Sequence, residues 1–540
     1  MNPVSQGSRD RGECSQTDSE SDFRCLARVP APLLAAFDGL ILFYVAWCLL
    51  PSATWGSSTL RFPFGGKFEA TLSRQHLYQF WVMLFIRQHV GARNHRPGIL
   101  ARGGTRLSPP FQSLVLFTAT LTVFLTLQPR LGVSSGDTLG ARLLPVSVLR
   151  EGNLDLDEFY PGISSDHRYS VRKYAGHWYP EFPIFVGITA TPIYAILSAL
   201  LPESSSRWTS SYRLENQDAA QSFEQIAASI IATLSVVVVW GFIRAVSPPS
   251  MQSMSLWIAA AYGFGTPILS TASRALWMHG PSCLFLAGAA LALFVKTDAR
   301  NLMLLIAGCC LGWACANRPS NAVIVLCVLP WVMLAHGRKA FYVAVGLGST
   351  LAIVFWVNAS IYDTILGGYA VFASDFHSFS PAVFATILFS PSRGLFLFSP
   401  YLLFPLVLVI ASIVRRGPWF PKLLVLAAVA SAVTVACYAS WSGGYSFGPR
   451  LLCEAALLLT LSLPFYVDRL ALHPPAKSLF LVLVIISCHI HITGVRFGDG
   501  EWTGKIFHGK QEVGRFWNPE DSQLWWSLSG GDRRSIPVAP

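Results

Sequence analysis

The sequence predicts an all-α membrane protein with many transmembrane segments, and three observations predict it. The mean hydropathy is +0.46, and 52% of the 540 residues are hydrophobic whereas only 13% are charged. Apolar runs near the roughly 20 residues that cross a bilayer recur along most of the chain. Lys and Arg gather in short loops between these runs, as they do in cytoplasmic loops of membrane proteins. This composition excludes an ordinary soluble globular protein.

The net charge and the cysteines exclude two further classes. The formal charge is +11, but no basic run is interleaved with aromatic residues on a soluble domain, so we expect no nucleic-acid partner. Most of the 11 cysteines lie inside apolar runs, where cysteine acts as a small hydrophobic residue. His489 and His491 fit helix packing better than a metal site. We therefore expect neither a disulfide framework nor a metal site built from these cysteines and histidines.

The first 110 residues differ from the rest of the chain. Residues 1–30 are polar and carry both signs of charge, which predicts a disordered cytoplasmic start. Residues 31–110 are expected to form an N-terminal extension with one or two membrane segments. The apolar runs 33–50 and 75–90 would make a hairpin that begins and ends inside. The alternative is an upstream extension that lies outside the working domain.

A regular transmembrane domain is expected over 111–493, followed by an extracytoplasmic tail over 494–540. About 11 core spans are expected, and they share an apolar run bounded by polar or basic loops: 111–129, 222–243, 254–271, 277–295, 301–316, 321–335, 340–358, 396–414, 421–439, 451–467 and 478–493. Residues 182–201 are also apolar. Their prolines and the parity of the other loops predict a half-buried or reentrant helix.

Basic residues at the helix ends divide into two groups. One group falls on a single face, which the positive-inside rule makes cytoplasmic: Arg244, Lys296, Arg300, Arg338, Lys339, Arg415, Arg416, Arg469 and Lys477. The other group lies at helix ends on the opposite face: Arg274, Arg318, Arg393 and Arg450. A single arginine there is typical of a snorkelling anchor. Four suggest a shared anion, and phosphate suits the planar fork of arginine.

Two long loops on the outer face carry the acidic candidates. The loop 130–221 holds Asp137 in a Ser/Gly-rich turn before Ala141–Leu149, an amphipathic stretch expected along the bilayer surface. A carboxylate at a lipid–water boundary is partly desolvated, which suits a general base. The alternative for Asp137 is a helix cap or a solvated loop residue. The loop 359–395 is rich in aromatic residues, which fit either an interfacial belt or the face of a sugar.

Five segments, in this order, resemble the bacterial branch of the GT-C glycosyltransferases. This branch is akin to protein O-mannosyltransferases and lipid A aminoarabinose transferases. The segments are "SGDTLGARLLPVSVLREGNLDLDEF", "GHWYPEFPIFVGITATPIYAI", "AYGFGTPILSTASRALWMHGPSCLFLAGAALALF", "LGWACANRPSNAVIVL" and "LFSPSRGLFLFSP" with "WSGGYSFGPRLL". The tail "RFWNPEDSQLWWSL" also resembles the end of that branch. The resemblance covers about 111–528.

The resemblance implies transfer of a sugar from a polyprenyl-phosphate donor to a glycan, lipid or protein acceptor on the extracytoplasmic face. It places the protein in a bacterial inner or plasma membrane. Asp137 would be the catalytic base. The arginines Arg393 and Arg450, with Arg274 and Arg318, would hold the donor phosphate. Candidate acceptor and sugar contacts are Asp155, Asp157, Glu158, His279, Asp375 and Trp441.

One motif departs from the family pattern. Relatives often place a glutamate after the Ser or His, whereas this chain has Gly280 after His279, so a role that needs an acid there is in doubt. Glu454 is expected either to pair with Arg450 one helical turn earlier or to line the cavity. A divalent cation at the donor stays open. The alternative functions are a transporter or lipid flippase, and a non-catalytic homologue that binds prenyl lipid.

Overall fold

The structure is a computed structural model of the whole chain. It describes residues 59–61, 67–69, 109–127, 135–200, 217–248, 252–414, 417–466, 474–497, 502 and 513–529. The chain divides into two compact units. One unit consists of residues 1–57 and 69–108, and the other of residues 58–68 and 109–540. The predicted disordered start and the predicted hairpin at 33–50 and 75–90 lie outside the described residues. Strands β1 (Thr59–Arg61) and β2 (Lys67–Glu69) pair with each other.

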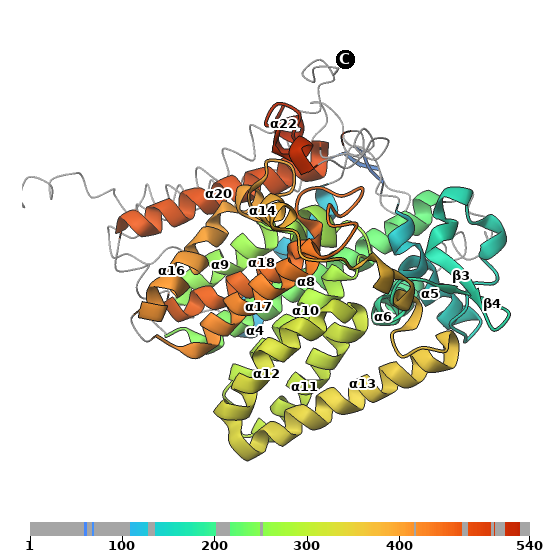
Figure 1. The fold of residues 1–540 in the computed structure, drawn as a ribbon, viewed down its shortest axis with the longest axis horizontal. Coiled ribbons are helices and arrows are strands. Elements are labelled where there is room, and N and C mark those ends of the chain that lie inside the picture. The colour runs from blue at the N-terminus through green and yellow to red at the C-terminus, as the bar shows by residue number, and fades with distance from the viewer. Residues whose placement is uncertain are drawn as a thin grey trace, which may run out of the picture. The chain divides into compact units, whose positions relative to one another are not determined.

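The all-α prediction is confirmed, because the described residues from 109 onward are mostly helical (Figure 1). The α-helices are α4 (Pro109–Thr126), α5 (Leu139–Arg150), α6 (Phe185–Leu200), α8 (Gln217–Val246), α9 (Gln252–Phe264), α10 (His279–Phe294), α11 (Arg300–Asn317), α12 (Ala322–His336), α13 (Ala340–Tyr362), α14 (Pro381–Phe389), α15 (Leu395–Phe398), α16 (Leu403–Val414), α17 (Trp419–Ala436), α18 (Cys453–Ser462), α20 (Pro474–Phe497) and α22 (Gln523–Leu528). A short antiparallel hairpin, β3 (Val171–Tyr174) and β4 (His177–Pro180), lies between α5 and α6.

Apolar helices of membrane-spanning length identify a membrane protein. Among the described residues four stretches are long and apolar enough to cross a bilayer: Ala220–Val246, Pro319–Tyr362, Trp419–Ala436 and Pro475–Arg496. The second of these contains both α12 and α13. Five shorter apolar helices accompany them: Pro110–Thr126, Phe185–Leu200, Met254–Phe264, His279–Phe294 and Pro400–Ile413. The number of 11 core spans stays a prediction.

Two expected spans are interrupted, and the sequence gives the reason. The span expected over 254–271 ends at Phe264 and resumes as a π-helix over Ile268–Ala272. The span expected over 396–414 is divided at Ser399 into α15 and α16. A proline follows each break, Pro267 and Pro400, and proline cannot donate the backbone hydrogen bond that a continuing helix requires.

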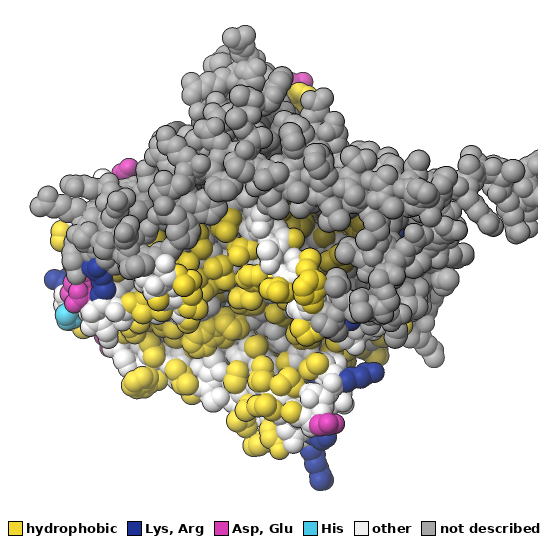
Figure 2. All heavy atoms as spheres, turned by 180° about the vertical axis from the view of Figure 1, so that it is seen from behind, with side chains coloured by type: hydrophobic (Ala, Val, Ile, Leu, Met, Phe, Trp, Pro, Cys, Tyr) yellow, Lys and Arg dark blue, Asp and Glu magenta, His cyan; other side chains and the backbone are white. Residues whose placement is uncertain are grey.

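The exposed surface is apolar over a broad area. Figure 2 shows hydrophobic side chains across much of the described surface, with charged groups toward its margins. Helices α12 and α13 carry exposed apolar side chains, among them Leu334 at 87% and Trp356 at 71% exposure. An exposed apolar area of this kind is costly in water and favourable in hydrocarbon. The surface therefore agrees with the membrane assignment.

Helices α11 and α13 lie side by side (Figure 1) and approach closely at two glycines. A Cβ added at Gly308 would lie 2.1 Å from the carbonyl oxygen of Val343, and one added at Gly346 would lie 2.2 Å from that of Leu305. Only a residue without a side chain fits here. Small residues allow this backbone approach between membrane helices.

The two long loops meet near the C-terminal end of α13. The Tyr362 hydroxyl donates to the carbonyl oxygen of Pro180 at 2.8 Å. Gly368 packs so closely on Glu181 that an added Cβ would lie 2.7 Å from its carbonyl oxygen. Helix α5, expected to lie along the bilayer surface, is instead buried over Leu139–Ser147 and packs on α6. Its apolar side faces protein, because α6 and the hairpin cover it.

Candidate functional site

Asp137 lies in a short 3₁₀ turn, Gly136–Thr138, directly before α5. The Ser135 hydroxyl accepts from the backbone N–H of Asp137 at 3.3 Å and holds the start of this turn. The Tyr169 hydroxyl donates to Asp137 Oδ1 at 2.7 Å. The Asp137 side chain keeps 24% of its surface exposed, so a molecule arriving at the site would still reach it.

Tyr169 packs over this turn. A Cβ added at Gly136 would lie 2.7 Å from the Tyr169 hydroxyl oxygen, so a larger residue there would displace the end of the Tyr169 side chain. Burial raises the pKa of Tyr169 well above its ordinary value, and the Asp137 charge raises it further. Tyr169 therefore stays protonated and remains a hydrogen-bond donor to the carboxylate.

Arg450 reaches Asp137 from a distant part of the chain. Its Nη2 donates to Asp137 Oδ2 at 3.1 Å. The guanidinium lies 3.9 Å from the centre of the Trp277 ring, a cation–π distance. Arg450 is 8% exposed, and its Nε and Nη1 are buried without a hydrogen-bond partner among the described residues. Two donors of a buried cation are thus left unused beside the carboxylate.

A second group of charged residues lies next to the backbone that follows Arg450. Arg318 Nη1 donates to Glu454 Oε2, and His279 Nδ1 lies 3.2 Å from Glu454 Oε1. Arg318 Nη2 donates to the carbonyl oxygen of Leu451 at 3.1 Å, one residue after Arg450. Glu454 is fully buried, and His279 and Arg318 are 1% and 6% exposed. We call Asp137, Arg450, Arg318, Glu454 and His279 the charged cluster.

The pairing of Glu454 with Arg450 does not form. Arg450 begins a 3₁₀ turn, Arg450–Leu452, and α18 starts only at Cys453. The spacing of one α-helical turn therefore does not apply to this pair. Glu454 pairs instead with Arg318 and His279, so the carboxylate beside His279 comes from α18.

Tyr369, in the second long loop, lies close to the charged cluster. Burial raises its pKa, and the positive charges of Arg318 and Arg450 oppose this rise. Tyr369 follows Gly368, whose backbone packs on the first loop. The meeting of the two loops thus brings a tyrosine toward the two arginines.

Arg274 lies apart from the charged cluster. Its guanidinium donates to the carbonyl oxygens of Phe124 and Leu127, at the end of α4, and to the Ser273 hydroxyl at 2.9 Å. These carbonyls close a helix C-terminus, where cations are favourable. Arg274 therefore stabilises the end of α4, and all three of its nitrogens are used.

Arg393 is also occupied by protein groups. Its Nε donates to Ser442 O at 2.6 Å, its Nη2 to Gly444 O at 3.2 Å, and its Nη1 to Gln523. It nevertheless lines a small pocket together with Arg450 and Trp441. Trp441 is 8% exposed and packs on Phe516 at 4.7 Å between ring centres. Trp441 therefore lies next to Arg450, with much of its ring covered.

Asp155 and Asp157 form a separate group with His177. The ligand atoms of these three residues lie within 4.8 Å of one another, and the group is the one set of potential metal ligands found among the described residues. Asp157 Oδ2 lies 2.7 Å from His177 Nδ1, and Asp157 Oδ1 accepts from the N–H of Trp178 at 2.7 Å. Their oxygen and nitrogen donors would suit a divalent cation. The contacts within the group also fix the hairpin.

Glu158 and Asp375 complete the predicted residues. Burial raises the pKa of Glu158, which lies in the same turn as Asp157. The carbonyl oxygen of Asp375 accepts from the N–H of Ala439 at 2.8 Å. This contact pins the second loop to the end of α17. Neither residue has a direct contact with Asp137 or Arg450 in the described part of the chain.

Sequence reasoning missed Tyr169, Trp277 and Tyr369. Tyr169 follows Asp137 by 32 positions, and no local pattern links the two. Trp277 lies two residues before His279, so its place beside a polar candidate could have indicated a role in the site.

Comparison with protein-family models, with curated proteins and with solved structures finds no match to this chain.

Proposed function

We propose that this protein is a multi-pass membrane glycosyltransferase of the GT-C type, with a bundle of about 11 spans. It transfers a sugar from a polyprenyl-phosphate donor to an acceptor at the extracytoplasmic face of a bacterial inner or plasma membrane. Asp137 is the general base, and Arg450 holds the donor phosphate. The contact between Asp137 and Arg450, with two donors of Arg450 left unused, carries this proposal.

The unused donors of Arg450 favour an anionic ligand. A buried N–H without a partner costs about 1–3 kcal/mol, and two nitrogens of the Arg450 guanidinium, Nε and Nη1, have no partner among the described residues. Phosphate oxygens accept charge-assisted hydrogen bonds from such donors. The Trp277 ring covers one face of the guanidinium, so an approaching phosphate meets it edge-on.

The reaction needs a cation and a base at neighbouring positions. When the glycosidic bond breaks, the prenyl phosphate leaves with additional negative charge, which an oriented arginine stabilises. The acceptor hydroxyl loses its proton to a carboxylate as it attacks the sugar. Arg450 and Asp137 supply these two groups within one contact of 3.1 Å. Arg318 donates to the carbonyl oxygen of Leu451, the residue after Arg450, and Glu454 holds Arg318 in this position.

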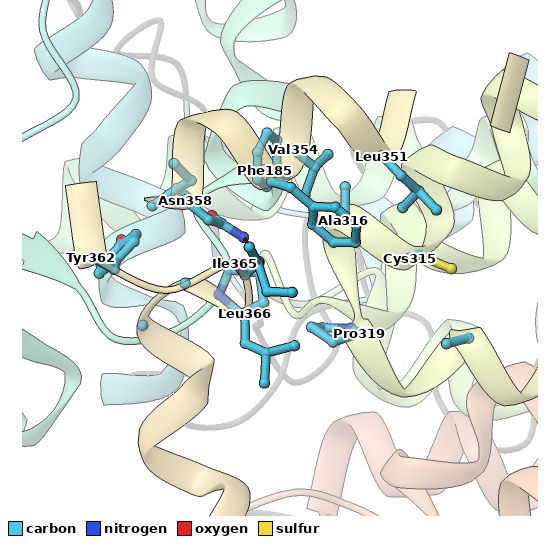
Figure 3. A pocket seen from close by; sticks show the side chains of 16 residues that line it. Phe185, Cys315, Ala316, Pro319, Leu351, Val354, Asn358, Tyr362, Ile365 and Leu366 are labelled. Carbon is cyan, nitrogen blue, oxygen red and sulfur yellow. Dashed lines mark hydrogen bonds between the residues drawn. The ribbon is translucent and has the colours of Figure 1, made fainter. Parts of the chain in front are cut away.

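An apolar pocket adjoins the charged cluster and suits the lipid part of the donor. The pocket holds about 700 Å³ of empty space, including the part open to the surroundings. Figure 3 shows Phe185, Leu351, Val354 and Leu366 around it. Pro319, the residue after Arg318, and Gly368, the residue before Tyr369, also line it. A prenyl chain in this pocket would have its phosphate end near Arg318 and Arg450.

Of the four predicted arginines, we propose Arg450 as the residue that holds the phosphate, because Arg318 is already paired with Glu454. Arg274 caps α4 and Arg393 holds the loop 442–444, so we assign neither to the donor. Asp155, Asp157 and Glu158 lie on the hairpin side of the first loop, where they suit acceptor contacts. Trp441 and His279 flank Arg450 and Arg318 respectively, so they suit the sugar.

Binding of radiolabelled polyprenyl phosphate to the purified protein tests the role of Arg450. Arg450→Ala should weaken binding at least about tenfold, since one charge-assisted contact contributes about 1.5–3 kcal/mol. Arg450→Lys should restore part of it, because lysine keeps the charge and loses the fork. Arg168→Ala, an exposed arginine of the first loop, is the matched control. Unchanged affinity in Arg450→Ala would remove the phosphate assignment.

A transfer assay in membranes with radiolabelled prenyl-phosphate sugars separates the proposed function from its alternatives. A transferase releases labelled prenyl-free product. A non-catalytic homologue binds the lipid and releases none. A flippase moves the intact donor across the membrane, which a protected-lipid assay in vesicles detects.

A further inference from the structure

Gln523, in the C-terminal helix α22, joins three parts of the protein. Its Oε1 accepts from the backbone N–H of Gly448 at 2.8 Å and also from the Arg393 guanidinium. Its Nε2 donates to the carbonyl oxygen of Ser446 at 3.0 Å. Gln523 is fully buried. A single amide thus saturates polar groups of the segment that leads to Arg450.

Arg393 continues the same set of contacts. It donates to the carbonyl oxygens of Ser442 and Gly444 at 2.6 and 3.2 Å. Together, Gln523 and Arg393 bind four backbone groups of residues 442–448, which we call the glycine loop. The glycine loop has no helix or strand of its own, so these side chains replace the hydrogen bonds that secondary structure would provide.

The backbone of the glycine loop needs such support. Gly443, Gly444 and Gly448 have φ of +76°, +63° and +67°, a region that side chains disfavour. Glycine has the largest conformational freedom to lose on ordering. Pro449 and Arg450 follow the glycine loop directly. A small change in the glycine loop would therefore displace the Arg450 guanidinium from Asp137.

Further contacts hold Trp502 and residues 513–529 in place. Leu524 N–H donates to Pro391 O at 3.3 Å. Phe516 packs on Trp441, and the Arg393 guanidinium lies 5.6 Å from the centre of the Trp502 ring. The C-terminal segment therefore packs against the glycine loop and against Trp441, the residue before it.

We propose that α22 is a positioning element for the anion site, in which Gln523, directly and through Arg393, fixes the glycine loop so that Arg450 faces Asp137. Gln523 touches neither of the reacting groups and is a positioning residue. The part of this inference that concerns donor affinity rests on the proposed function. The part that concerns the order of the loop does not.

Two measurements on the full-length protein test it. Hydrogen exchange followed by mass spectrometry reports the order of residues 442–450, and radiolabelled polyprenyl phosphate reports the anion site. Gln523→Leu keeps the approximate volume and removes all three hydrogen bonds. We expect exchange in 442–450 to rise and donor affinity to fall, each by about tenfold, because several buried polar groups lose their partner.

Two variants control for general damage to α22. Gln523→Glu keeps an acceptor for Gly448 and Arg393 and loses only the donor to Ser446, so it should recover most of the affinity and most of the protection. Trp525→Ala changes a side chain of α22 that is 51% exposed and should leave both readouts unchanged. If Gln523→Leu does not fold, Gln523→Glu must still show faster exchange at 446–448 than Trp525→Ala.

The outcomes separate the two proposals. Unchanged exchange in Gln523→Leu, or faster exchange with unchanged donor affinity, overturns the positioning role. Absence of polyprenyl-phosphate binding in the wild type rejects the proposed function. In that case exchange at 442–450 alone decides whether Gln523 orders the loop.

Discussion

Asp137 and Arg450 are 313 positions apart in the chain and meet at 3.1 Å. Neither residue uses all the hydrogen bonds of the other. The Asp137 carboxylate also accepts from Tyr169, and the Arg450 guanidinium has two nitrogens without a partner among the described residues. The pair therefore balances its charge without closing the site. A bound phosphate would accept hydrogen bonds from the unpartnered nitrogens of Arg450 while Asp137 remains next to it.

The first prediction concerns Asp137 as the base. Asp137→Asn keeps the shape of the side chain and cannot accept the proton of the acceptor. Sugar transfer should fall by about 10²–10⁴-fold, the usual contribution of general-base catalysis. Polyprenyl-phosphate affinity should be kept or increase, because Arg450 loses its competing anion. Asp166→Asn, an exposed acid of the same loop, is the control. Near-normal transfer in Asp137→Asn would reject its role as base.

The second prediction concerns the buried pair of Arg318 and Glu454. Removing one partner leaves an uncompensated buried charge, so Glu454→Gln should destabilise the protein by about 3–5 kcal/mol. The double variant Glu454→Gln with Arg318→Met should recover part of this loss, because both charges are then gone. Thermal unfolding in detergent measures the double-mutant cycle. Additive losses would show that the two residues do not interact.

The third prediction concerns pH and Glu181. Burial raises the pKa of Glu181, and Arg172 only partly opposes the shift. The pKa of Glu181 is higher in the folded than in the unfolded protein, so protonation of this carboxyl favours the folded state. This stabilisation is complete below about pH 4.3, the ordinary glutamate pKa, and is lost as the pH rises through the folded value.

The stability of Glu181→Gln relative to the wild type should therefore increase as the pH rises from about 4 to neutral. Thermal unfolding curves of the two proteins, recorded at the same pH values, measure this difference. Glu520→Gln, an exposed acid, should follow the wild-type curve. Parallel curves for Glu181→Gln and wild type would contradict the shift.

The fourth prediction concerns the orientation of α13. This helix of 23 residues rises about 35 Å at 1.5 Å per residue, enough to cross the hydrocarbon. Its ends should then face opposite sides of the membrane. In a cysteine-free background, Ser374→Cys and Glu151→Cys should react with an impermeant reagent from outside, and Lys339→Cys only after permeabilisation. Labelling of Lys339→Cys from outside would invert the topology.

The membrane class and the helical segments could be predicted from the sequence, because both depend on composition and on nearby residues. Apolar runs such as 222–243 and 478–493 appear as α8 and α20. The interruptions after Phe264 and Phe398 were missed although Pro267 and Pro400 signal them locally. Run length alone hides a break when the residues on both sides are apolar.

The candidate site could be predicted in part. The structure brings Asp137, Arg318, Arg450 and His279 into one cluster with Glu454. Asp137 was selected as an acid of the first outer loop and His279 through the resemblance, whereas Arg318 and Arg450 were selected as basic residues at helix ends. The same criterion selected Arg274 and Arg393, which bind backbone carbonyls instead. An arginine that caps a helix and one that awaits an anion look alike in a sequence, because the difference lies in which acceptors surround them.

The sequence by itself determined where helices form, which segments are apolar enough for a membrane and which polar residues lie at their ends. Tertiary structure decided the partners. Hydropathy and propensity act over a few residues, whereas the contacts of Arg450 with Asp137 and Trp277 join positions that only packing brings together. These distant contacts decide whether the nitrogens of a buried guanidinium find acceptors. All three nitrogens of Arg393 do, whereas two nitrogens of Arg450 have none among the described residues.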